Sequence, residues 1–235
     1  MFRLAFLAFL GAASAVEFEF RNNGGSEIWV GIQGNPGHPA LEGGGFPLGP
    51  GQSRVVGAED NWAGRFWGRT WCDPGSQHCQ TGDCGNRLQC GGAGGVPPAT
   101  LAEITLKGDA GKDFYDISLV DGYNIKMSMT PIGGSGDGSQ YSCKRAGCDF
   151  NINDDCPGEL QVNSEHGVIA CKSACLAFNN DEFCCRGAFN DPNKCRAGEY
   201  ANRFKAHCPD AYSYAYDDHK STFTCKANRY LITFQ

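Results

Sequence analysis

The sequence predicts a mainly β protein that is cross-linked by disulfide bonds and exported from the cell. Stretches that alternate apolar with polar residues recur between clusters of glycine and proline, which is the pattern of short β-strands separated by turns. The 14 cysteines of the 235-residue chain all lie from Cys72 onward. An even number of cysteines in an oxidising compartment predicts up to seven bridges.

The N-terminus predicts export. Arg3 precedes an apolar run, Leu4–Leu10, which leads to Ala13-Ser14-Ala15. Such a run is too short to cross a bilayer and is typical of a secretory signal peptide. We therefore expect residues 1–15 to be removed and the mature chain to begin at Val16. No other apolar run is long enough to span a membrane and no lipid-anchor signal follows, so we expect a soluble, secreted protein.

Charge and spacing exclude several classes of ligand. Without the signal peptide, 19 basic and 26 acidic side chains remain, a net charge of −7. This charge disfavours nucleic acid and anionic lipid as partners, which require basic surfaces. Neither a Cys-x-x-Cys pair nor closely spaced histidines occur, so we expect no metal site and no cofactor. The adjacent Cys184 and Cys185 each need a partner elsewhere, because neighbours are poorly placed to bond each other.

The first part of the chain predicts strands and then a loop. Alternation at Val16–Asn22, Glu27–Ile32 and Arg54–Val56 predicts three short strands, and the aromatic-rich Trp62–Trp71 predicts another. The segment Cys72–Cys90 contains four cysteines among glycines and polar residues. It therefore predicts a loop held by local bridges.

Strand signals return after the loop. Leu101–Leu106 and Asp113–Val120 predict two strands. Asp121-Gly122 is a favoured hairpin dipeptide, so Tyr123–Met129 is expected to be the return strand of a hairpin.

The last third predicts a second lobe held by bridges, followed by two strands. Between Cys143 and Cys208, the four-residue spacing of Cys171 and Cys175 predicts one helix. The spacing of Tyr200, Phe204 and Cys208 predicts another, which Pro209 stops. Ser221–Cys225 and Tyr230–Phe234 have strand character and are expected to complete the first sheet system.

One segment resembles a known family. The segment that continues to Cys90 begins with Gly75-Ser76-Gln77-His78-Cys79-Gln80-Thr81-Gly82-Asp83-Cys84. It resembles the signature of the thaumatin-like proteins. These include sweet proteins, osmotins and pathogenesis-related defence proteins. The resemblance extends over the mature chain, and the supporting stretches are Phe66–Thr70, Pro97–Glu103, Asp116–Asn124, Glu182–Cys185 and Cys208–Tyr214.

The resemblance implies a fold of three parts. A flattened antiparallel β-sandwich is expected from residues 16–70, 101–149 and 209–235, a small disulfide loop lobe from 71–100, and a disulfide-rich, partly helical lobe from 150–208. It also implies seven bridges: Cys72–Cys79, Cys84–Cys90, Cys143–Cys225, Cys148–Cys208, Cys156–Cys171, Cys175–Cys184 and Cys185–Cys195.

The chain departs from the family pattern at two pairs of positions. Gln77 and Asn86 replace small residues of the signature, and Asn tolerates left-handed backbone angles. Relatives usually have sixteen cysteines, and Gly24 and Gln235 occupy the places of the missing two. Their joint loss leaves no orphan thiol, and we expect the chain ends to fray more than in relatives.

The resemblance also implies an acidic cleft between the sandwich and the helical lobe. Its lining falls on Arg65, Glu103, Asp116, Asp121 and Asp217, and the neighbouring Asp218 is an alternative for the last position. We expect an aromatic wall from Phe114, Tyr115, Tyr123 and Tyr214.

The cleft acids allow two chemistries. Carboxylates can accept hydrogen bonds from sugar hydroxyls, which favours binding. Alternatively, Glu103 as acid and Asp121 as its partner could hydrolyse a glycosidic bond.

Structural roles are the alternative for each residue of the cleft. Asp121 precedes Gly122 in a turn dipeptide, Glu103 could simply be solvated, and Arg65 could be an ion-pair partner. Asp116 and Asp121 have opposite parity, so they share a cleft only if a turn intervenes. Asp83 is expected to cap loop amides and is given no catalytic role.

The leading hypothesis is a monomeric, secreted, lectin-like defence protein that binds fungal β-1,3-glucan in this cleft and inhibits fungal growth. Two alternatives stay open. One is a weak endo-β-1,3-glucanase that uses Glu103 and Asp121, and the other is a receptor ligand or hydrolase inhibitor that acts through loops.

Overall fold

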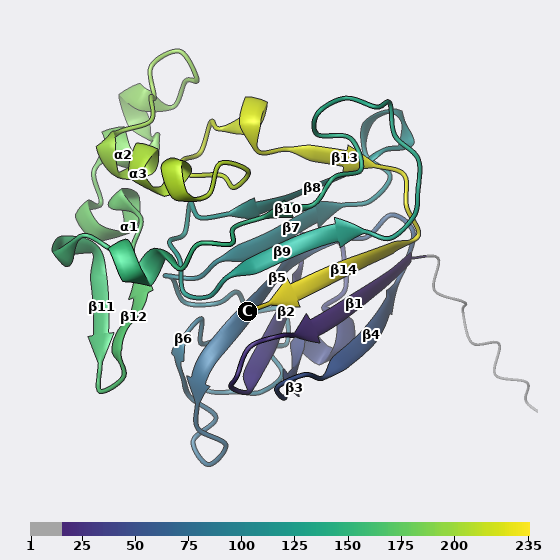
Figure 1. Cartoon of the computed structure of the whole chain (residues 1–235), viewed down its shortest axis with the longest axis horizontal. Helices are drawn as coiled ribbons and strands as arrows, with labels where there is room; N and C mark the ends of the chain where they lie inside the picture. The colour runs from purple at the N-terminus through teal and green to yellow at the C-terminus, as the bar shows by residue number, and fades with distance from the viewer. Residues whose placement is uncertain (1–15) are drawn as a thin grey trace, which may run out of the picture.

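Two β-sheets packed face to face form the body of the protein in the computed structural model, which describes residues 16–235 (Figure 1). The first sheet has the strand order β10-β9-β14-β1-β4. The second has the order β13-β8-β7-β5-β2-β3, with β6 paired to β5. A separate hairpin, β11-β12, and short helices lie to one side (Figure 1). The predicted mainly β class is confirmed, whereas the predicted signal peptide lies outside the described residues.

The elements have the following bounds. The strands of the first sheet are β10 (Ala146–Gly147), β9 (Met127–Pro131), β14 (Arg229–Phe234), β1 (Val16–Asn22) and β4 (Ser53–Ala58). Those of the second are β13 (Phe223–Cys225), β8 (Asp113–Ser118), β7 (Leu101–Thr105), β5 (Ala63–Cys72), β2 (Ile28–Gly34), β3 (Gly45–Leu48) and β6 (Cys79–Thr81). The hairpin is β11 (Gln161–Ser164) and β12 (Gly167–Cys171), and the α-helices are α1 (Ala174–Phe178), α2 (Asp181–Cys184) and α3 (Glu199–His207). The 3₁₀ turns are η1 (Leu41–Gly44), η2 (Asp109–Gly111), η3 (Ile152–Asp155), η4 (Gly158–Leu160), η5 (Gly187–Phe189) and η6 (Asp218–Lys220).

Aromatic side chains from both sheets fill the space between them. In β1 the buried positions alternate with partly exposed ones, and Phe18 and Phe20 are fully buried. Their rings lie 4.9 and 5.1 Å from the ring of Phe66 in β5, in edge-to-face contact. The alternation of the sequence therefore produces a sandwich core, because one face of each sheet is apolar.

One strand pair is parallel. β1 pairs with β4 in antiparallel fashion, but it pairs with β14 in parallel, with Phe20 opposite Ile232. A parallel pair cannot be joined by a short hairpin, and these strands are far apart in the chain. The other pairs within the two sheets of the described residues are antiparallel, as the resemblance implied.

The predicted hairpin around Asp121-Gly122 is wrong. The turn exists, because Gly122 has φ +88° and its N–H donates to the carbonyl of Leu119 at 2.9 Å. However, β8 pairs with β7 and β13, whereas β9 pairs with β14 and β10 in the other sheet. The chain crosses between the sheets after the turn, so the next strand begins only at Met127.

One of the two helix predictions is also wrong. Cys171 is the last residue of β12, and α1 begins at Ala174 after Ser173, whose Oγ accepts from the N–H of Leu176 at 3.2 Å. The four-residue spacing of the cysteines was thus not a helix face. The second prediction is confirmed, because α3 includes Tyr200 and Phe204 and ends at His207, just before Pro209.

The structure contains seven disulfide bonds, which are the pairs that the resemblance implied. In the loop that follows β6, the Asp83 carboxylate accepts from the N–H groups of Cys79, Gly85 and Asn86 at 2.9–3.0 Å. Burial opposes ionisation of Asp83, but these three donors leave its pKa below the ordinary value. Asn86 has φ +55°, the left-handed conformation that asparagine tolerates.

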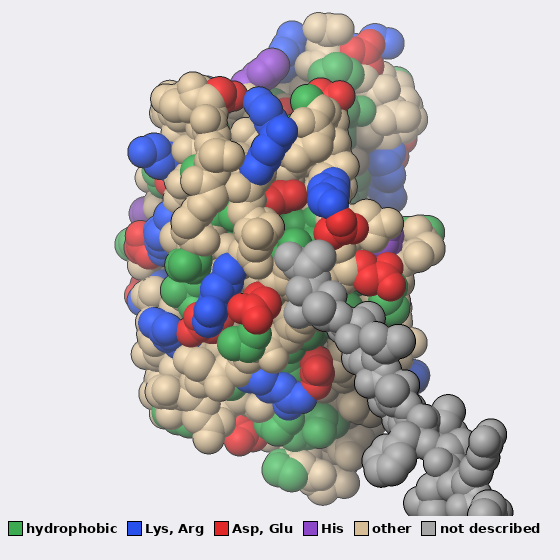
Figure 2. Space-filling view, turned by 90° about the vertical axis from the view of Figure 1, so that its right-hand side faces the viewer, with side chains coloured by type: hydrophobic (Ala, Val, Ile, Leu, Met, Phe, Trp, Pro, Cys, Tyr) green, Lys and Arg blue, Asp and Glu red, His purple; other side chains and the backbone are tan. Residues whose placement is uncertain are grey.

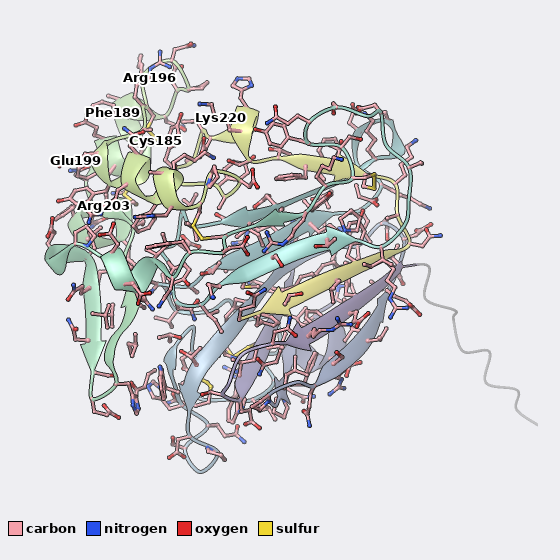
Figure 3. All side chains as sticks on the ribbon, viewed as in Figure 1. Cys185, Phe189, Arg196, Glu199, Arg203 and Lys220 are labelled. Carbon is pink, nitrogen blue, oxygen red and sulfur yellow. A yellow bond between two sulfur atoms is a disulfide. The ribbon has the colours of Figure 1, made fainter. Side chains whose placement is uncertain are left out.

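The helical lobe lies to one side of the sheets (Figure 1) and packs against them, because Ile152, Leu160 and Phe204 belong to the same buried core cluster as the sheet residues. The labelled residues Cys185, Phe189, Arg196, Glu199 and Arg203 all lie in it, at the upper left of Figure 3. On the face drawn in Figure 2, basic and acidic side chains are intermixed. Within residues 16–235, no helix is both long enough and apolar enough to cross a membrane.

Candidate functional site

Three neighbouring strands place three charged residues in one row. In the register of the second sheet, Arg65 of β5 lies opposite Glu103 of β7, and Glu103 lies opposite Asp116 of β8. Directly opposed residues share a sheet face. The inward-facing neighbours Phe66 and Ile117 are fully buried, so the row lies on the outer face.

A turn brings the fourth charged residue to the same side. β8 ends at Ser118, and the carbonyl of Asp121 accepts from the N–H of Ala99 at 3.1 Å. The turn therefore intervenes between Asp116 and Asp121, which resolves their opposite parity. Gly122 is required here, because a Cβ would lie 2.6 Å from Pro98 Cβ and 2.7 Å from the carbonyl oxygen of Cys171.

These four residues line a cavity of about 400 Å³. The remaining lining residues are Leu101, Ser118, Val120, Tyr212 and Ala215. The segment that contains Tyr212 is anchored to the sheet, because its N–H donates to Ile117 and its carbonyl accepts from Leu119, each at 2.8 Å. The opposite wall of the cavity is thus fixed by backbone hydrogen bonds.

The structure does not bring Asp217 into the lining of this cavity. Its buried carboxylate accepts from the backbone N–H and the Oγ of Ser213, both at 3.1 Å, and lies 2.9 Å from Lys205 Nζ. Asp217 therefore fixes the loop that runs from Ser213 to Asp217. Asp218, in contrast, interacts with residues that line the cavity. It accepts a hydrogen bond from the hydroxyl of Tyr212 at 2.7 Å, and its negative charge helps to raise the pKa of Asp116.

The acids of the cleft are crowded around a single cation. Burial raises the pKa of Glu103; Arg65 opposes this rise and Asp121 adds to it. Burial also holds the pKa of Asp116 well above its ordinary value, with Glu103 and Asp218 adding to the effect and Arg65 opposing it. The Oδ1 atom of Asp116 is buried without a hydrogen-bond partner. The cleft can therefore hold a protonated carboxyl beside ionised ones.

The ion pair in the cleft remains accessible. Arg65 Nη2 lies 3.1 Å from Glu103 Oε1, and the two side chains are 36% and 31% exposed. A pair exposed to this degree contributes only about 0–1 kcal/mol to stability. It can therefore rearrange to bind a ligand at little cost.

We expect Asp116→Asn to stabilise the protein at neutral pH. Between the unfolded pKa of 3.8 and the raised folded pKa, the folded state retains a proton that the unfolded state releases. The contribution of Asp116 to stability therefore falls as the pH rises through this window. Asparagine removes this penalty, so we expect a gain of about 0.5–2 kcal/mol near pH 7 that shrinks toward zero below the unfolded pKa.

Urea unfolding of the wild type and Asp116→Asn at acidic and neutral pH measures this difference. The exposed acid Asp109 supplies the matched control Asp109→Asn, for which no pH-dependent gain is expected. An equal gain for Asp116→Asn at both pH values, or a loss at neutral pH, would contradict the proposed penalty.

The expected aromatic wall is corrected by the structure. Tyr115 and Tyr123 are fully buried in the core and cannot face a ligand in the cleft. Phe114 does not line the cavity, and Tyr214 lines a neighbouring cavity of about 50 Å³ that shares Val120 and Ala215 with it.

Two residues of the cleft were not predicted as its main residues. Tyr212 and the preferred role of Asp218 depend on where the segment after α3 meets β8. The sequence signal for Tyr212 was the stretch Cys208–Tyr214, which supported the resemblance but carried no assigned role, whereas Asp218 was the alternative to Asp217 for the last cleft position. Within residues 16–235, no group of three or more His, Cys, Asp or Glu side chains is arranged to hold a metal ion.

Comparisons with known proteins place the chain in one group. A model of the Thaumatin family matches residues 22–235. The chain is 52% identical to pathogenesis-related protein 5 of Arabidopsis thaliana, covering 98% of this chain and 96% of that protein. It is 48% identical to thaumatin-like protein 1a of Malus domestica, covering 98% and 94%.

Two solved structures share the fold at low sequence identity. One is a laminaripentaose-producing β-1,3-glucanase in complex with laminaritetraose, with a TM-score of 0.57, 12% identity, and coverage of 95% of this chain and 99% of that one. The other is a family 64 laminaripentaose-producing β-1,3-glucanase from Paenibacillus barengoltzii, also with a TM-score of 0.57 and 12% identity, and coverage of 99% and 79%. At this identity the likeness concerns the fold alone.

Proposed function

This chain belongs to the thaumatin family, and from that premise we propose that it is a secreted defence protein that binds fungal β-1,3-glucan in its acidic cleft and restrains fungal growth. The observation that carries the proposal is the cavity where Arg65, Glu103, Asp116 and Asp121 converge. The register of β5, β7 and β8 presents Arg65, Glu103 and Asp116 on one outer face, and the turn after β8 adds Asp121.

The chemistry of the cavity suits a sugar polymer. Ionised carboxylates accept hydrogen bonds from hydroxyl groups, and a protonated carboxyl can donate one. The raised pKa values of Glu103 and Asp116, which follow mainly from burial, favour a mixture of the two forms. A β-1,3-glucanase of the same fold was solved with laminaritetraose bound, which supports this ligand class for a fold of this shape.

Retention on insoluble β-1,3-glucan tests the binding site. We expect the double variant Glu103→Gln/Asp121→Asn to weaken retention at least about tenfold, because hydrogen bonds to charged groups contribute about 1.5–3 kcal/mol each. The matched control Asp109→Asn/Glu182→Gln removes the same charge from exposed positions and should leave retention unchanged. Equal retention of both double variants would exclude the cleft as the binding site.

Weak hydrolysis by the same cleft is a second candidate. The specific observation is the raised pKa of Glu103, caused first by burial and increased by Asp121, since a general acid must keep its proton near the working pH. The same preparations are therefore assayed for reducing ends released from laminarin. Release by the wild type that is lost in Glu103→Gln establishes hydrolysis, whereas no release at any pH leaves binding as the activity of the cleft.

A further inference from the structure

A second, larger hollow lies away from the acidic cleft. It has a volume of about 610 Å³ and is formed where the turn after β1, the end of β5 and the β11-β12 hairpin meet. In Figure 1 the β11-β12 hairpin lies at the lower left, with the lower end of β5 to its right. We call it the hairpin hollow and define it by Gly25, Trp71, Asn151, Asn153 and His166. None of these residues lines the acidic cleft.

The hairpin hollow is held open by contacts between its walls. The indole of Trp71 stacks on the imidazole of His166, with ring centroids 3.7 Å apart and an interplanar angle of 10°. Beside this stack, Gln80 Nε2 donates to Glu165 Oε1 at 3.2 Å. These contacts join the tip of the hairpin to β5 and β6, so the cavity is preformed and needs no rearrangement before a ligand enters.

Many polar side chains line the hollow. Of its four asparagines, Asn22 and Asn124 are buried and hydrogen-bonded within the protein, whereas Asn151 and Asn153 are partly exposed. The apolar residues Ile28 and Ile169 are buried and offer little exposed apolar surface to a ligand. The lining also includes the charged side chains of Glu27, Lys126 and Asp154, so it offers both donors and acceptors. A molecule with many hydroxyl groups suits such a lining, because each hydroxyl can donate and accept.

Trp71 supplies one flat apolar surface at the rim. It is 43% exposed, whereas Trp29, Trp62 and Trp67 are at most 4% exposed. Its backbone has φ +56°, which is unusual for a bulky residue, and the imidazole of His166 covers one face of its ring. A flat, partly exposed indole can stack on the apolar face of a pyranose ring.

Asn153 leaves an acceptor unpaired in the wall of the hollow. Its Nδ2 donates to the carbonyl of Asn124 at 3.3 Å, but its Oδ1 is buried without a hydrogen-bond donor. An unpaired buried acceptor costs about 1–3 kcal/mol. This oxygen is covered in the present structure, so it is not one of the groups that a ligand in the hollow contacts directly.

We propose that the hairpin hollow is a second carbohydrate site, which binds an oligosaccharide with one sugar ring stacked on the face of Trp71 that His166 leaves free and with hydroxyl groups bonded to partly exposed polar side chains such as Asn151. The site is independent of the acidic cleft and of the function proposed for it. A protein with two separated sugar sites can hold two chains, or two parts of one chain, and binds a polymer surface more tightly than either site alone.

Fluorescence quenching isolates this site, because Trp71 is the exposed member of the four tryptophans. Collisional quenching by acrylamide is measured with laminaripentaose, cellopentaose and chitopentaose as separate probes. A bound sugar is expected to shield Trp71 and to lower the quenching constant about twofold, since the other three indoles are already buried. Calorimetry with the same probe gives the affinity, which Trp71→Ala should weaken about tenfold.

A blocking variant distinguishes this hollow from other surfaces. A Cβ on Gly25 would meet no atom within 4 Å and its φ is not positive, so Gly25→Phe should fold and place a ring over the opening. Gly158 has the same two properties in the helical lobe, which makes Gly158→Phe the matched control. The proposal requires shielding that is lost in Gly25→Phe and kept in Gly158→Phe.

Three results would overturn the proposal. The first is an unchanged quenching constant with all three probes. The second is shielding that survives Gly25→Phe, or that is lost in Glu103→Gln/Asp121→Asn and so belongs to the cleft. The third is shielding by a polar hexapeptide of glycine and asparagine but by no saccharide, which would assign the hollow to peptide. Shielding that persists in the cleft variant supports the second site even if the function proposed for the cleft fails.

Discussion

Replacing Arg69 by leucine is expected to destabilise the protein by about 3–5 kcal/mol, the range found when one partner of a buried charged network is removed. Arg69 lies in β5 and is fully buried. Burial lowers its pKa to about 10, with Asp83 opposing the shift, so the side chain remains protonated at neutral pH. A buried cation persists only where its donors are paired.

The guanidinium of Arg69 joins two parts of the molecule. Its donors reach the carbonyl oxygens of Trp29 and Val30 in β2 at 3.3 and 2.9 Å. They also reach those of Arg87 and Leu88 in the disulfide loop at 2.8 and 2.6 Å. Leucine would leave four carbonyl groups without these donors. Both the sheet and the attachment of the loop lobe therefore depend on one side chain.

Urea unfolding with the disulfides intact measures the loss, and limited proteolysis of residues 73–96 reports on detachment of the loop. Arg69→Lys should be intermediate, because a single ammonium cannot reach four carbonyls arranged for a planar guanidinium. The control is Arg145→Leu, which removes a half-exposed arginine from a surface ion pair with Asp149 and should cost at most about 1 kcal/mol. A similar small loss for Arg69→Leu would show that the loop is attached by its other contacts.

The local parts of the fold could be predicted from the sequence, but the pairings between distant segments could not. Alternation located β1, because one face of that strand is buried, and a run of aromatic residues located β5, which is buried on both faces along most of its length. Both signals lie in neighbouring residues. The dipeptide Asp121-Gly122 also predicted a turn that the structure contains. The strand expected to follow it was wrong, because a turn dipeptide does not specify which sheet the following residues join.

The candidate site shows the same limit. Arg65, Glu103 and Asp116 came from a family resemblance, and only the register of three strands places them in one row. Tyr212 and Asp218 approach the cleft because the segment after α3 bonds to residues 117–119, a contact between positions about a hundred residues apart. The hairpin hollow has no sequence motif at all, because its walls come from segments that are separate in the chain.

The double variant Gly24→Cys/Gln235→Cys is expected to form an eighth disulfide bond. Asn22 of β1 lies opposite Phe234 of β14, and the N–H of Asn23 donates to the carbonyl of Phe234 at 2.8 Å. A Cβ built on Gly24 lies 3.9 Å from the Cα of Gln235, and Gly24 does not have a positive φ. Bridged residues normally have Cβ atoms about 3.5–4.5 Å apart and Cα atoms about 4.4–6.8 Å apart, and a Cβ-to-Cα distance of 3.9 Å is compatible with both ranges. The positions of the two cysteines that relatives usually add are thus already adjacent.

The bridge should stabilise the protein by about 2–4 kcal/mol, because it closes a long loop in the unfolded chain, although the existing bridge Cys143–Cys225 shortens that loop. Thiol titration and the loss of two hydrogens by mass spectrometry establish that the bond has formed, and urea unfolding gives the gain. Gly24→Ser/Gln235→Ser is the unbridged control of similar size. Thiols that stay free after oxidation would contradict the adjacency of the two positions, and a bridged variant no more stable than the serine control would contradict the gain.

The same variant separates two roles of this region. In the present chain hydrogen bonds, packing and the ion pairs of Arg229 with Glu17 and Glu19 maintain the pairing of β1 with β14. Gly24 and Gln235 also line the hairpin hollow. Hydrogen exchange of the amides of Asn23 and Gln235 should slow in the bridged variant, because local opening of this strand pair would then require the linked ends to move together. If the bridge slows exchange while the shielding of Trp71 by a sugar is unchanged, the opening of the ends is not needed for a ligand to enter the hollow. If the bridge slows exchange and also reduces the shielding of Trp71, a ligand enters the hollow through the opening of the unbridged chain ends.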